Sequence, residues 1–418
     1  MTESLPENKN DSQSFFNKEG VVVSQIEIGD GIPLGIKTVS NSDLGIAGAY
    51  GAWGTSYDNA SLPDFVGQRL GTPLGDDEIM NLEDLGFLNR HHTPMLSDND
   101  HLELELEVGA QMLRKAADAS GWDTSEVQGV LIGMSCPISN DYLTRISEKA
   151  GIPTDALKVT VHKACDGSMG ALHLALNPEL SADGNVNIAE ELKGKKVLVG
   201  GIEALSRLTS RAKDKNALQL FGNGAGVIGL VPGETMKFLT GKSHENYDED
   251  GLLQLRMFYP HSGERVPGRS MLETQFESSK SIRIAGLMHE PLDGAPILMA
   301  GLMGMVKLFV RTGVEVVTDV YHEYHSLMDR LGQSGKSFEL AIAHHANYKI
   351  NLLKAKQLMK NGVQIPMPWL LNDFGNVSAA SCMIAFLRQL QSLKAGDHIL
   401  FDGFGAGTYY DVMAVSLG

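Results

Sequence analysis

Cysteine is scarce in this sequence, and acidic residues outnumber basic ones. The three cysteines, Cys136, Cys165 and Cys382, show neither the CxxC spacing of a structural zinc site nor the even number of a disulfide framework. We therefore expect reduced thiols and no bound metal. The 35 lysines and arginines face 51 aspartates and glutamates, which gives a net charge of −16. Because no basic face is available to neutralise phosphates, we do not expect a nucleic-acid partner.

The sequence also lacks a long hydrophobic run and a secretory signal. Its longest apolar stretch, residues 295–310, contains Lys307 and is too short to span a bilayer. The first residues, MTESLPENKNDSQSFF, have neither a basic region nor an apolar core of the kind found in signal peptides. We expect a soluble cytoplasmic protein without membrane insertion. Its 418 residues are enough for two to three domains.

Strand and helix patterns alternate along most of the chain. After a polar tail comes a β-rich extension, and from about residue 44 apolar strands alternate with helical stretches. This alternation predicts crossover connections and a mostly parallel sheet. The strands predicted most clearly are VQGVLIG, LKVTVHK, KKVLVGG, GVIGLV, FELAIAH, DHILFDG and DVMAVSL.

Cys165 lies where a strand pattern gives way to a helix pattern. Residues 159–161 are β-rich, residues 163–166 form a turn, and residues 167–176 form a helix of small and apolar residues. The free N–H groups and the positive dipole end of a helix favour a thiolate over a thiol, so the position suits a nucleophile. A cysteine at the end of a strand is also often an inert buried side chain, and this segment alone leaves both interpretations open.

Two segments of the C-terminal third supply neutral hydrogen-bond donors at turns. His344 follows the apolar strand FELAIA, and Asn376 lies in the turn GNVSAAS, which opens another helix. A glycine-rich loop at residues 401–407, FDGFGAG, follows a third strand and offers backbone N–H groups. Together with Cys165, these segments predict one active site assembled from distant parts of the chain.

The motifs HxAN, GNxSAAS and FGxG, in this order after the cysteine segment, resemble those of type III β-ketoacyl-(acyl carrier protein) synthases. These are condensing enzymes of the thiolase superfamily, and the resemblance covers about residues 44–418. It implies an α/β, thiolase-like fold in which two similar α/β halves form a layered αβαβα arrangement. It also implies that Cys165 carries the acyl group and that His344 and Asn376 complete the triad. The backbone N–H groups of Cys165 and Ala406 would then form the oxyanion hole.

The resemblance divides the chain into four parts. Residues 1–43 are a tail and a β-rich extension, and residues 44–235 are the N-terminal half with the cysteine. Residues 236–284 are a connecting segment and a possible lid, and residues 285–418 are the C-terminal half with the histidine and the asparagine. The family also implies a homodimer.

The chemistry implied is acyl transfer to Cys165 followed by a decarboxylative Claisen condensation that gives a β-ketoacyl thioester. Loss of carbon dioxide from a malonyl thioester makes the carbanion without a strong base. The enolate oxygen then needs only hydrogen-bond donors that do not lose their proton in the working pH range. Neutral imidazole and amide groups meet that need. We expect no bound cofactor, because acyl and malonyl thioesters of coenzyme A or acyl carrier protein would be the substrates.

Three positions depart from the segments that hold the nucleotide end of coenzyme A in housekeeping members of the family. Met80 and Asp84 stand where a tryptophan and an arginine are usual, and Lys215 replaces another arginine. Loss of the aromatic surface and reversal of a charge should weaken adenine and phosphate contacts. We therefore expect a specialised homologue fed by an acyl carrier protein, in a lipid or secondary-metabolite pathway.

Carrier proteins are acidic, so docking on this acidic chain needs a local basic patch. Lys349, Lys307 and Lys354 are the candidates, and Lys349 matches a basic docking position of the family. The alternative is that these lysines only form a solvent-exposed helix face and bind no partner.

Cys136, Met303 and Phe404 are candidates for lining the acyl pocket, although packing accounts for such residues as well. Two other functions also stay open. One is a non-decarboxylating acyltransferase or thiolase-like enzyme, and the other is a non-catalytic partner subunit of a heterodimeric synthase. Retention of the cysteine, the histidine and the asparagine counts against both.

Overall fold

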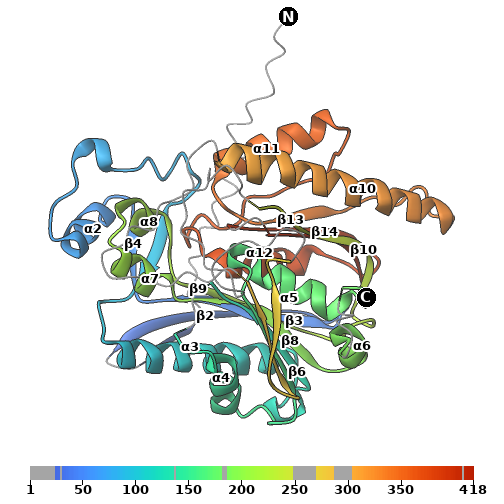
Figure 1. Ribbon diagram of the computed structural model, residues 1–418, viewed down its shortest axis with the longest axis horizontal. Coiled ribbons are helices and arrows are strands. Elements are labelled where there is room, and N and C mark those ends of the chain that lie inside the picture. The colour runs from blue at the N-terminus through green and yellow to red at the C-terminus, as the bar shows by residue number, and fades with distance from the viewer. Residues whose placement is uncertain are drawn as a thin grey trace, which may run out of the picture.

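The computed structural model describes residues 24–28, 31–135, 138–180, 186–247, 270–286, 304–406 and 409–418. Two β-sheets alternate with three layers of helices, and Figure 1 shows this stack from the α10–α11 layer at the top to the α3–α4 layer at the bottom. The layered αβαβα arrangement predicted from the sequence is confirmed. No helix among these residues is both long and apolar enough to cross a bilayer.

The larger sheet has nine strands in the order β1-β2-β3-β9-β8-β6-β7-β12-β11. Its strands are β1 (Ser24–Ile28), β2 (Ile32–Asn41), β3 (Ile46–Trp53), β6 (Gly129–Gly133), β7 (Leu157–Val161), β8 (Val197–Glu203), β9 (Gly224–Leu230), β11 (Glu273–Ser278) and β12 (Ser281–Ala285). Only the central run β8-β6-β7-β12 is parallel, and the other neighbours are antiparallel. The prediction of a mostly parallel sheet was wrong. A helical segment between two strands does not by itself make them parallel, because the chain can enter the second strand from either end of the sheet.

The smaller sheet has the order β10-β15-β14-β13. Its strands are β10 (Met236–Glu245), β13 (Leu340–Ala343), β14 (His398–Gly405) and β15 (Tyr409–Leu417). β10 pairs along its whole length with β15, while β11 and β12 extend the larger sheet beside β7. The described parts of residues 236–284 therefore build both sheets, and we correct their interpretation as a connecting segment.

Helices cover the outer faces of both sheets and fill the space between them. The outer helices are α3 (Asp98–Ala119) and α4 (Tyr142–Ala150) on one side, and η4 (Met305–Thr312), α10 (Gly313–Arg330) and α11 (Tyr348–Lys360) on the other. Between the sheets lie α5 (Gly167–Leu176) and α12 (Ser381–Gln389). The remaining helices and strands are β4 (Thr55–Asp58), α2 (Leu62–Leu70), η1 (Asp76–Glu78), β5 (Asn89–His92), η2 (Thr124–Glu126), η3 (Ala164–Asp166), α6 (Ile188–Leu192), α7 (Leu205–Ala212), α8 (Lys215–Leu220), η5 (Ser378–Ala380) and η6 (Leu390–Ser392).

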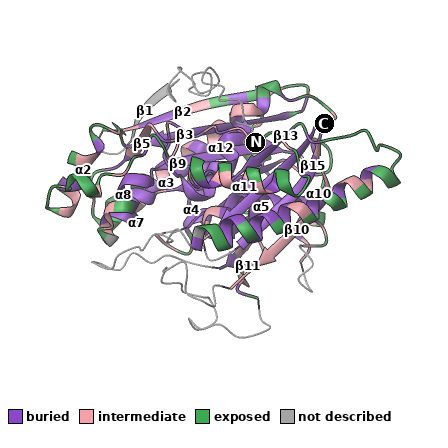
Figure 2. Ribbon diagram, turned by 90° about the horizontal axis from the view of Figure 1, so that it is seen from above, coloured by how far each residue is buried: buried purple, intermediate pink, exposed green. Residues whose placement is uncertain are grey.

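The helix α5 is the centre of the molecule, and its sequence explains why. All ten of its residues are buried, as its purple colour in Figure 2 shows. Because an apolar helix without a polar face has to be covered on all sides, it lies between the two sheets. Its first residue, Gly167, packs so closely on the end of β6 that a Cβ added at Gly133 would lie 2.1 Å from the Gly167 carbonyl carbon. The start of this buried helix is the place where Cys165 was predicted.

Candidate active site

Cys165 lies in the short helix η3, between β7 and the first turn of α5, as the sequence predicted. The residue before it, Ala164, has a φ of 49°, a left-handed conformation that is costly for a side chain with a Cβ. The chain turns sharply here and leaves Cys165 partly exposed at the end of an otherwise buried segment. A partly exposed cysteine residue at such a turn can be reached by a substrate.

Two groups from distant segments contact the sulfur of Cys165. The Ser378 hydroxyl lies 3.3 Å from Sγ, and the backbone N–H of Ala406 forms a hydrogen bond to the same atom. Burial nevertheless raises the pKa of the Cys165 thiol to about 11, against the opposing effect of these two donors. The expected resting thiolate is thus corrected: the group is a thiol at neutral pH and needs a proton acceptor when it reacts.

His344 follows β13 and is fixed through its ring and its backbone. Its Nδ1 lies 2.6 Å from Ser381 Oγ, and its carbonyl accepts a hydrogen bond of 2.8 Å from Asn351 Nδ2. Burial lowers the pKa of His344 to about 3, so the ring is neutral at physiological pH. The side chain is therefore a hydrogen-bond partner that keeps its character throughout the neutral range.

His345, the residue after His344, is also held by contacts within the protein. Its Nδ1 lies 2.8 Å from the carbonyl of Ala343, and its Nε2 accepts a hydrogen bond of 2.9 Å from the N–H of Leu370. The ring packs on Trp369 with centroids 4.6 Å apart. His345 thus fixes the loop beside His344.

Asn376 is held at both ends of its amide in the turn before η5. Its Nδ2 donates to the Ala346 carbonyl at 3.2 Å, and its Oδ1 accepts from the Ser378 N–H at 2.9 Å. The same turn sends Ser378 to Cys165, and the following helix sends Ser381 to His344. The predicted cysteine, histidine and asparagine segments therefore meet at one place, joined by two serine hydroxyls.

The glycines of β14 allow the loop with Ala406 to approach the cysteine turn. A Cβ added at Gly405 would lie 2.1 Å from the Lys163 carbonyl oxygen. No other residue type would leave room for this approach of two backbones. The close packing places the Ala406 N–H at the sulfur, as a predicted donor of the oxyanion hole. Gly407 of the same motif lies outside the described residues.

Sequence reasoning missed two buried carboxyl groups beside the cysteine. Glu203 ends β8, and its Oε1 accepts hydrogen bonds from Ser135 and from the N–H of Ala379. Burial raises the pKa of Glu203 to about 7, and burial together with the nearby Asp411 raises the pKa of Asp166 well above its ordinary range. For Glu203, the signal available in the sequence was an acidic residue directly after the apolar strand VLVGGI.

The three lysines proposed for carrier docking lie in different surroundings. Lys349 is exposed and forms an ion pair of 3.0 Å with Asp84, and Lys307 is exposed on η4. Lys354 is only 1% exposed and pairs with Asp402 at 2.6 Å, so it cannot meet a partner protein. Five residues along a helix turn the side chain by about 140°, which takes Lys354 from the exposed face of α11 to the buried one.

The three pocket candidates find no support in the described residues. Cys136 and Met303 lie outside them. Phe404 is buried, and its ring packs on Phe309 and Tyr410 at centroid distances of 4.4 and 5.1 Å, so its place in an acyl pocket stays a prediction.

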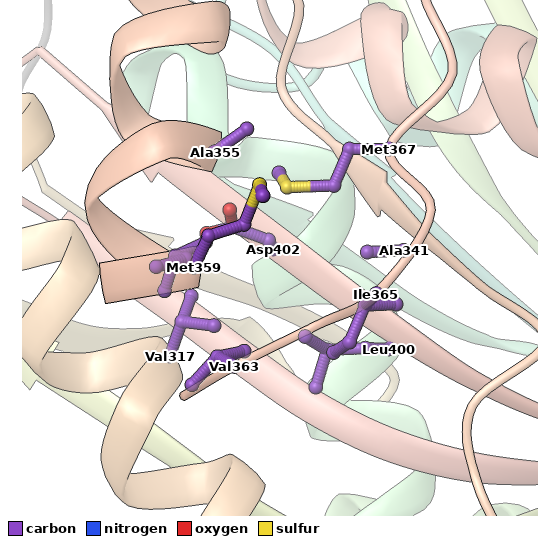
Figure 3. Close-up of a pocket in the computed structure, with 10 residues that line it drawn as sticks. Val317, Ala341, Ala355, Met359, Val363, Ile365, Met367, Leu400 and Asp402 are labelled. Atoms are coloured by element: carbon purple, nitrogen blue, oxygen red, sulfur yellow. The ribbon is translucent and has the colours of Figure 1, made fainter. Parts of the chain in front are cut away.

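A separate cavity of about 110 Å³ lies among α10, α11, β13 and β14, and Figure 3 shows Met359 and Met367 at its wall. Asp402 lines the cavity as well. None of the predicted catalytic or pocket residues lines it, so it is a feature of the C-terminal half apart from the cysteine.

The residues that depart from the usual coenzyme A segment are engaged within the protein. Lys215 pairs with Glu78, and Asp84 pairs with Lys349. Met80 packs against an apolar cluster that contains Leu218. Lys215 and Asp84 are each held in an ion pair, and Met80 packs inward. This segment therefore presents no aromatic ring at these positions.

Comparison with known proteins agrees with this geometry. Residues 328–417 match the family model described as 3-oxoacyl-[acyl-carrier-protein (ACP)] synthase III C terminal. Over 305 residues the chain is 26% identical to β-ketoacyl-[acyl-carrier-protein] synthase III of Neisseria meningitidis serogroup B, covering 72% of this chain and 80% of that protein. A synthase of the same name from Syntrophomonas wolfei is 27% identical over 368 residues, covering 84% of this chain and 93% of its own.

The fold is shared with solved structures of the same kind. The priming β-ketosynthase of the R1128 polyketide biosynthetic pathway superposes with a TM-score of 0.56 at 20% identity, covering 90% of this chain and 95% of that one. The thiolase-like fold predicted from the motifs is confirmed.

Proposed function

We propose that the chain is a type III ketosynthase-like enzyme of the thiolase superfamily, to whose members it is similar, and that it catalyses a decarboxylative Claisen condensation. Cys165 takes an acyl group from a thioester, and a malonyl-type thioester then supplies the carbon nucleophile. The observation that carries the proposal is the meeting of the Cys165, His344 and Asn376 segments through Ser378 and Ser381. An inert buried cysteine would not account for a partly exposed residue whose sulfur has two donors directed at it.

In the first half-reaction, the sulfur of Cys165 attacks the thioester carbonyl and the carrier thiol leaves. The carbonyl oxygen becomes negatively charged in the tetrahedral intermediate, and the backbone N–H groups of Cys165 and Ala406 would stabilise it. The backbone N–H of Ala406 is hydrogen-bonded to the sulfur. Donors held in place before the reaction need no reorganisation as the charge develops.

In the second half-reaction, the malonyl thioester loses carbon dioxide, and its α-carbon attacks the acyl group on Cys165. The transient enolate oxygen would accept hydrogen bonds from His344 and Asn376. Burial keeps His344 neutral, with a pKa of about 3, so the ring neither protonates the enolate nor changes its charge between pH 5 and pH 9. The product is a β-ketoacyl thioester, and Cys165 leaves as a thiolate that takes up one proton from solvent to return to the thiol.

The proposed substrates are thioesters of an acyl carrier protein, in a specialised lipid or secondary-metabolite pathway. The carboxylate of Asp84 supports this choice, because a negative charge at a position where an arginine is usual repels nucleotide phosphates. Lys349 and Lys307 are the remaining docking candidates. No bound cofactor, a homodimer and a cytoplasmic location complete the proposal.

The test is intact-protein mass spectrometry after exposure to acyl donors on coenzyme A and on carrier protein, with and without a malonyl donor. We expect an acyl mass on the wild type that disappears when the malonyl donor is added and is absent in Cys165→Ala. Cys382→Ala is the matched control, because that thiol is completely buried and should not load. Acyl mass on Cys165→Ala would overturn the assignment. Loading that survives malonyl addition would favour a non-decarboxylating acyltransferase.

A further inference from the structure

A buried chain of polar groups leads from the sulfur of Cys165 to the carboxyl group of Glu203. The Ser378 hydroxyl lies 3.3 Å from Cys165 Sγ and 2.7 Å from Ser135 Oγ, and it is also hydrogen-bonded to Glu203. Ser135 Oγ donates to Glu203 Oε1 at 2.7 Å. Ser135, Glu203 and Ser378 are at most 3% exposed, so water does not compete for these bonds.

The turn that carries Ser378 is held in an unusual backbone conformation. Ser378 has a φ of 45°, in the left-handed region, where a residue with a side chain is strained. Glu203 also accepts the N–H of the next residue, Ala379, at 3.1 Å. The hydrogen bond from Ala379 to Glu203 therefore holds the strained turn in the conformation that directs the Ser378 hydroxyl toward the Cys165 sulfur.

His344 is poorly suited to take the proton of the cysteine. Burial lowers its pKa to about 3, and Nδ1 is already engaged with Ser381. The thiol itself, with a pKa raised by burial to about 11, does not ionise unaided at neutral pH. An acceptor with a pKa near the working pH is the most effective general base, and burial gives Glu203 a pKa of about 7.

We propose that Glu203 accepts the proton of Cys165 through the Ser378 hydroxyl while the sulfur attacks the acyl donor. This inference rests on the proposed role of Cys165 as the acyl carrier. The Ser378 hydroxyl, which donates to the sulfur at rest, turns its proton toward Glu203 for this step. As the S–C bond forms, the S–H proton passes to Ser378 Oγ, and the Ser378 proton passes to a Glu203 oxygen. When the tetrahedral intermediate collapses, the proton returns along the same route to the leaving thiolate. The site carries one negative charge at every stage, so no second buried charge has to be created.

Most other titratable groups around the site are either kept far from neutral pKa values by burial or held in ion pairs, and Asp166, whose pKa is also raised, is the exception. The surrounding groups are His162, His173, His344, His345, Lys163, Lys354, Asp166, Asp402, Asp411 and Tyr142. Burial keeps the pKa values of His162, His344 and His345 at about 3 to 4. Lys163 and His173 contact Asp411, and Lys354 contacts Asp402. A titration near neutral pH at the cysteine is therefore assigned to Glu203 or to Asp166, the neighbour of Cys165, and loss of the inflection in Glu203→Gln decides for Glu203.

The experiment is the rate of reaction of Cys165 from about pH 5.5 to about pH 9.5, a range that brackets a general base of neutral pKa. Two reagents are used on the full-length protein, iodoacetamide and a loading acyl thioester, and peptide mass spectrometry locates the modification. In the wild type, both rates should rise with pH, with a midpoint near the pKa of Glu203, and then level off. Glu203→Gln keeps an oxygen for the N–H donors but cannot take a proton. Its acyl loading at neutral pH should fall by about 100-fold or more, the range of a lost general base.

The shape of the pH profile separates proton transfer from a structural role. Glu203→Gln and Ser378→Ala should lose the plateau, so that the rate keeps rising toward the ionisation of the thiol itself. Glu105→Gln is the matched control, because Glu105 is also buried with a pKa raised to about 7 but is paired with Arg207. This control should retain the wild-type midpoint, with thermal melting used to establish that each variant is folded.

A uniform fall in rate with the midpoint retained in Glu203→Gln would overturn the proposal, because it would mean that Glu203 only holds the turn. An unchanged profile would overturn it too. The alkylation arm does not depend on any acyl donor. If the alkylation rate of the wild type shows the inflection with pH but the wild type takes no acyl group, the proposed function is contradicted while the proton route is still supported.

Discussion

Replacing Lys354 tests whether this lysine belongs to the core or to a docking surface. Its Nζ lies 2.6 Å from Asp402 Oδ2 and 5.0 Å from the ring centre of Phe309, and both charged side chains are 1% exposed. Lys354→Met removes the cation but leaves the carboxylate buried. Breaking a buried ion pair in this way costs about 3–5 kcal/mol, a large part of the stability of a folded domain.

The double variant and the pH dependence sharpen the test. Lys354→Met/Asp402→Asn removes both charges and should recover most of the loss, since an uncharged pair requires no ionic desolvation. Burial raises the pKa of Asp402 even beside the lysine, so without the lysine it should be raised further. A carboxyl group whose folded pKa exceeds the unfolded one adds stability at low pH and loses it as pH rises through the folded pKa. The deficit of Lys354→Met should therefore shrink from pH 8 toward pH 5.

The assay is urea unfolding of wild type, both variants and Lys356→Met, a substitution of a more exposed lysine on the same helix. Lys356→Met should change the unfolding free energy by less than about 0.5 kcal/mol, as surface substitutions do. If Lys354→Met is as stable as wild type and impairs only turnover with carrier protein, the assignment to the core is refuted.

Three further outcomes follow from the site. His344→Ala should still accept an acyl group on the cysteine but should release carbon dioxide from a malonyl donor at least 100-fold more slowly, as for a lost oxyanion donor; equal loss of both steps in single-turnover assays would contradict this division of roles. Ser381→Ala removes the partner of the His344 ring and should lower condensation without preventing loading, and an unchanged condensation rate would show that the bond is dispensable. Lys349→Glu should weaken turnover with a carrier protein in a salt-dependent way and leave turnover of small thioester mimics unaffected. Because this variant also breaks the ion pair with Asp84 and places two acids together, Asp84→Asn is the control for the broken pair. Equal effects on both substrates would exclude docking.

Local patterns predicted the framework because the relevant signals are local. The strand β7, the turn η3 and the helix α5 were expected from apolar residues followed by small ones, and the structure has them at nearly the same residues. His344 and Asn376 were recognised because their motifs mark the ends of elements. The direction of neighbouring strands was not predictable in this way, and neither was the participation of β10, β11 and β12 in the two sheets.

The sequence by itself determined where Cys165, His344 and Asn376 stand, because each lies at the end of a strand or the start of a helix that short-range patterns specify. Only the tertiary structure decided their chemical state. Burial raises the pKa of Cys165 and of Glu203 and lowers that of His344, and it removes Lys354 from the surface. Desolvation depends on atoms contributed by segments hundreds of residues apart, so no window of sequence contains it.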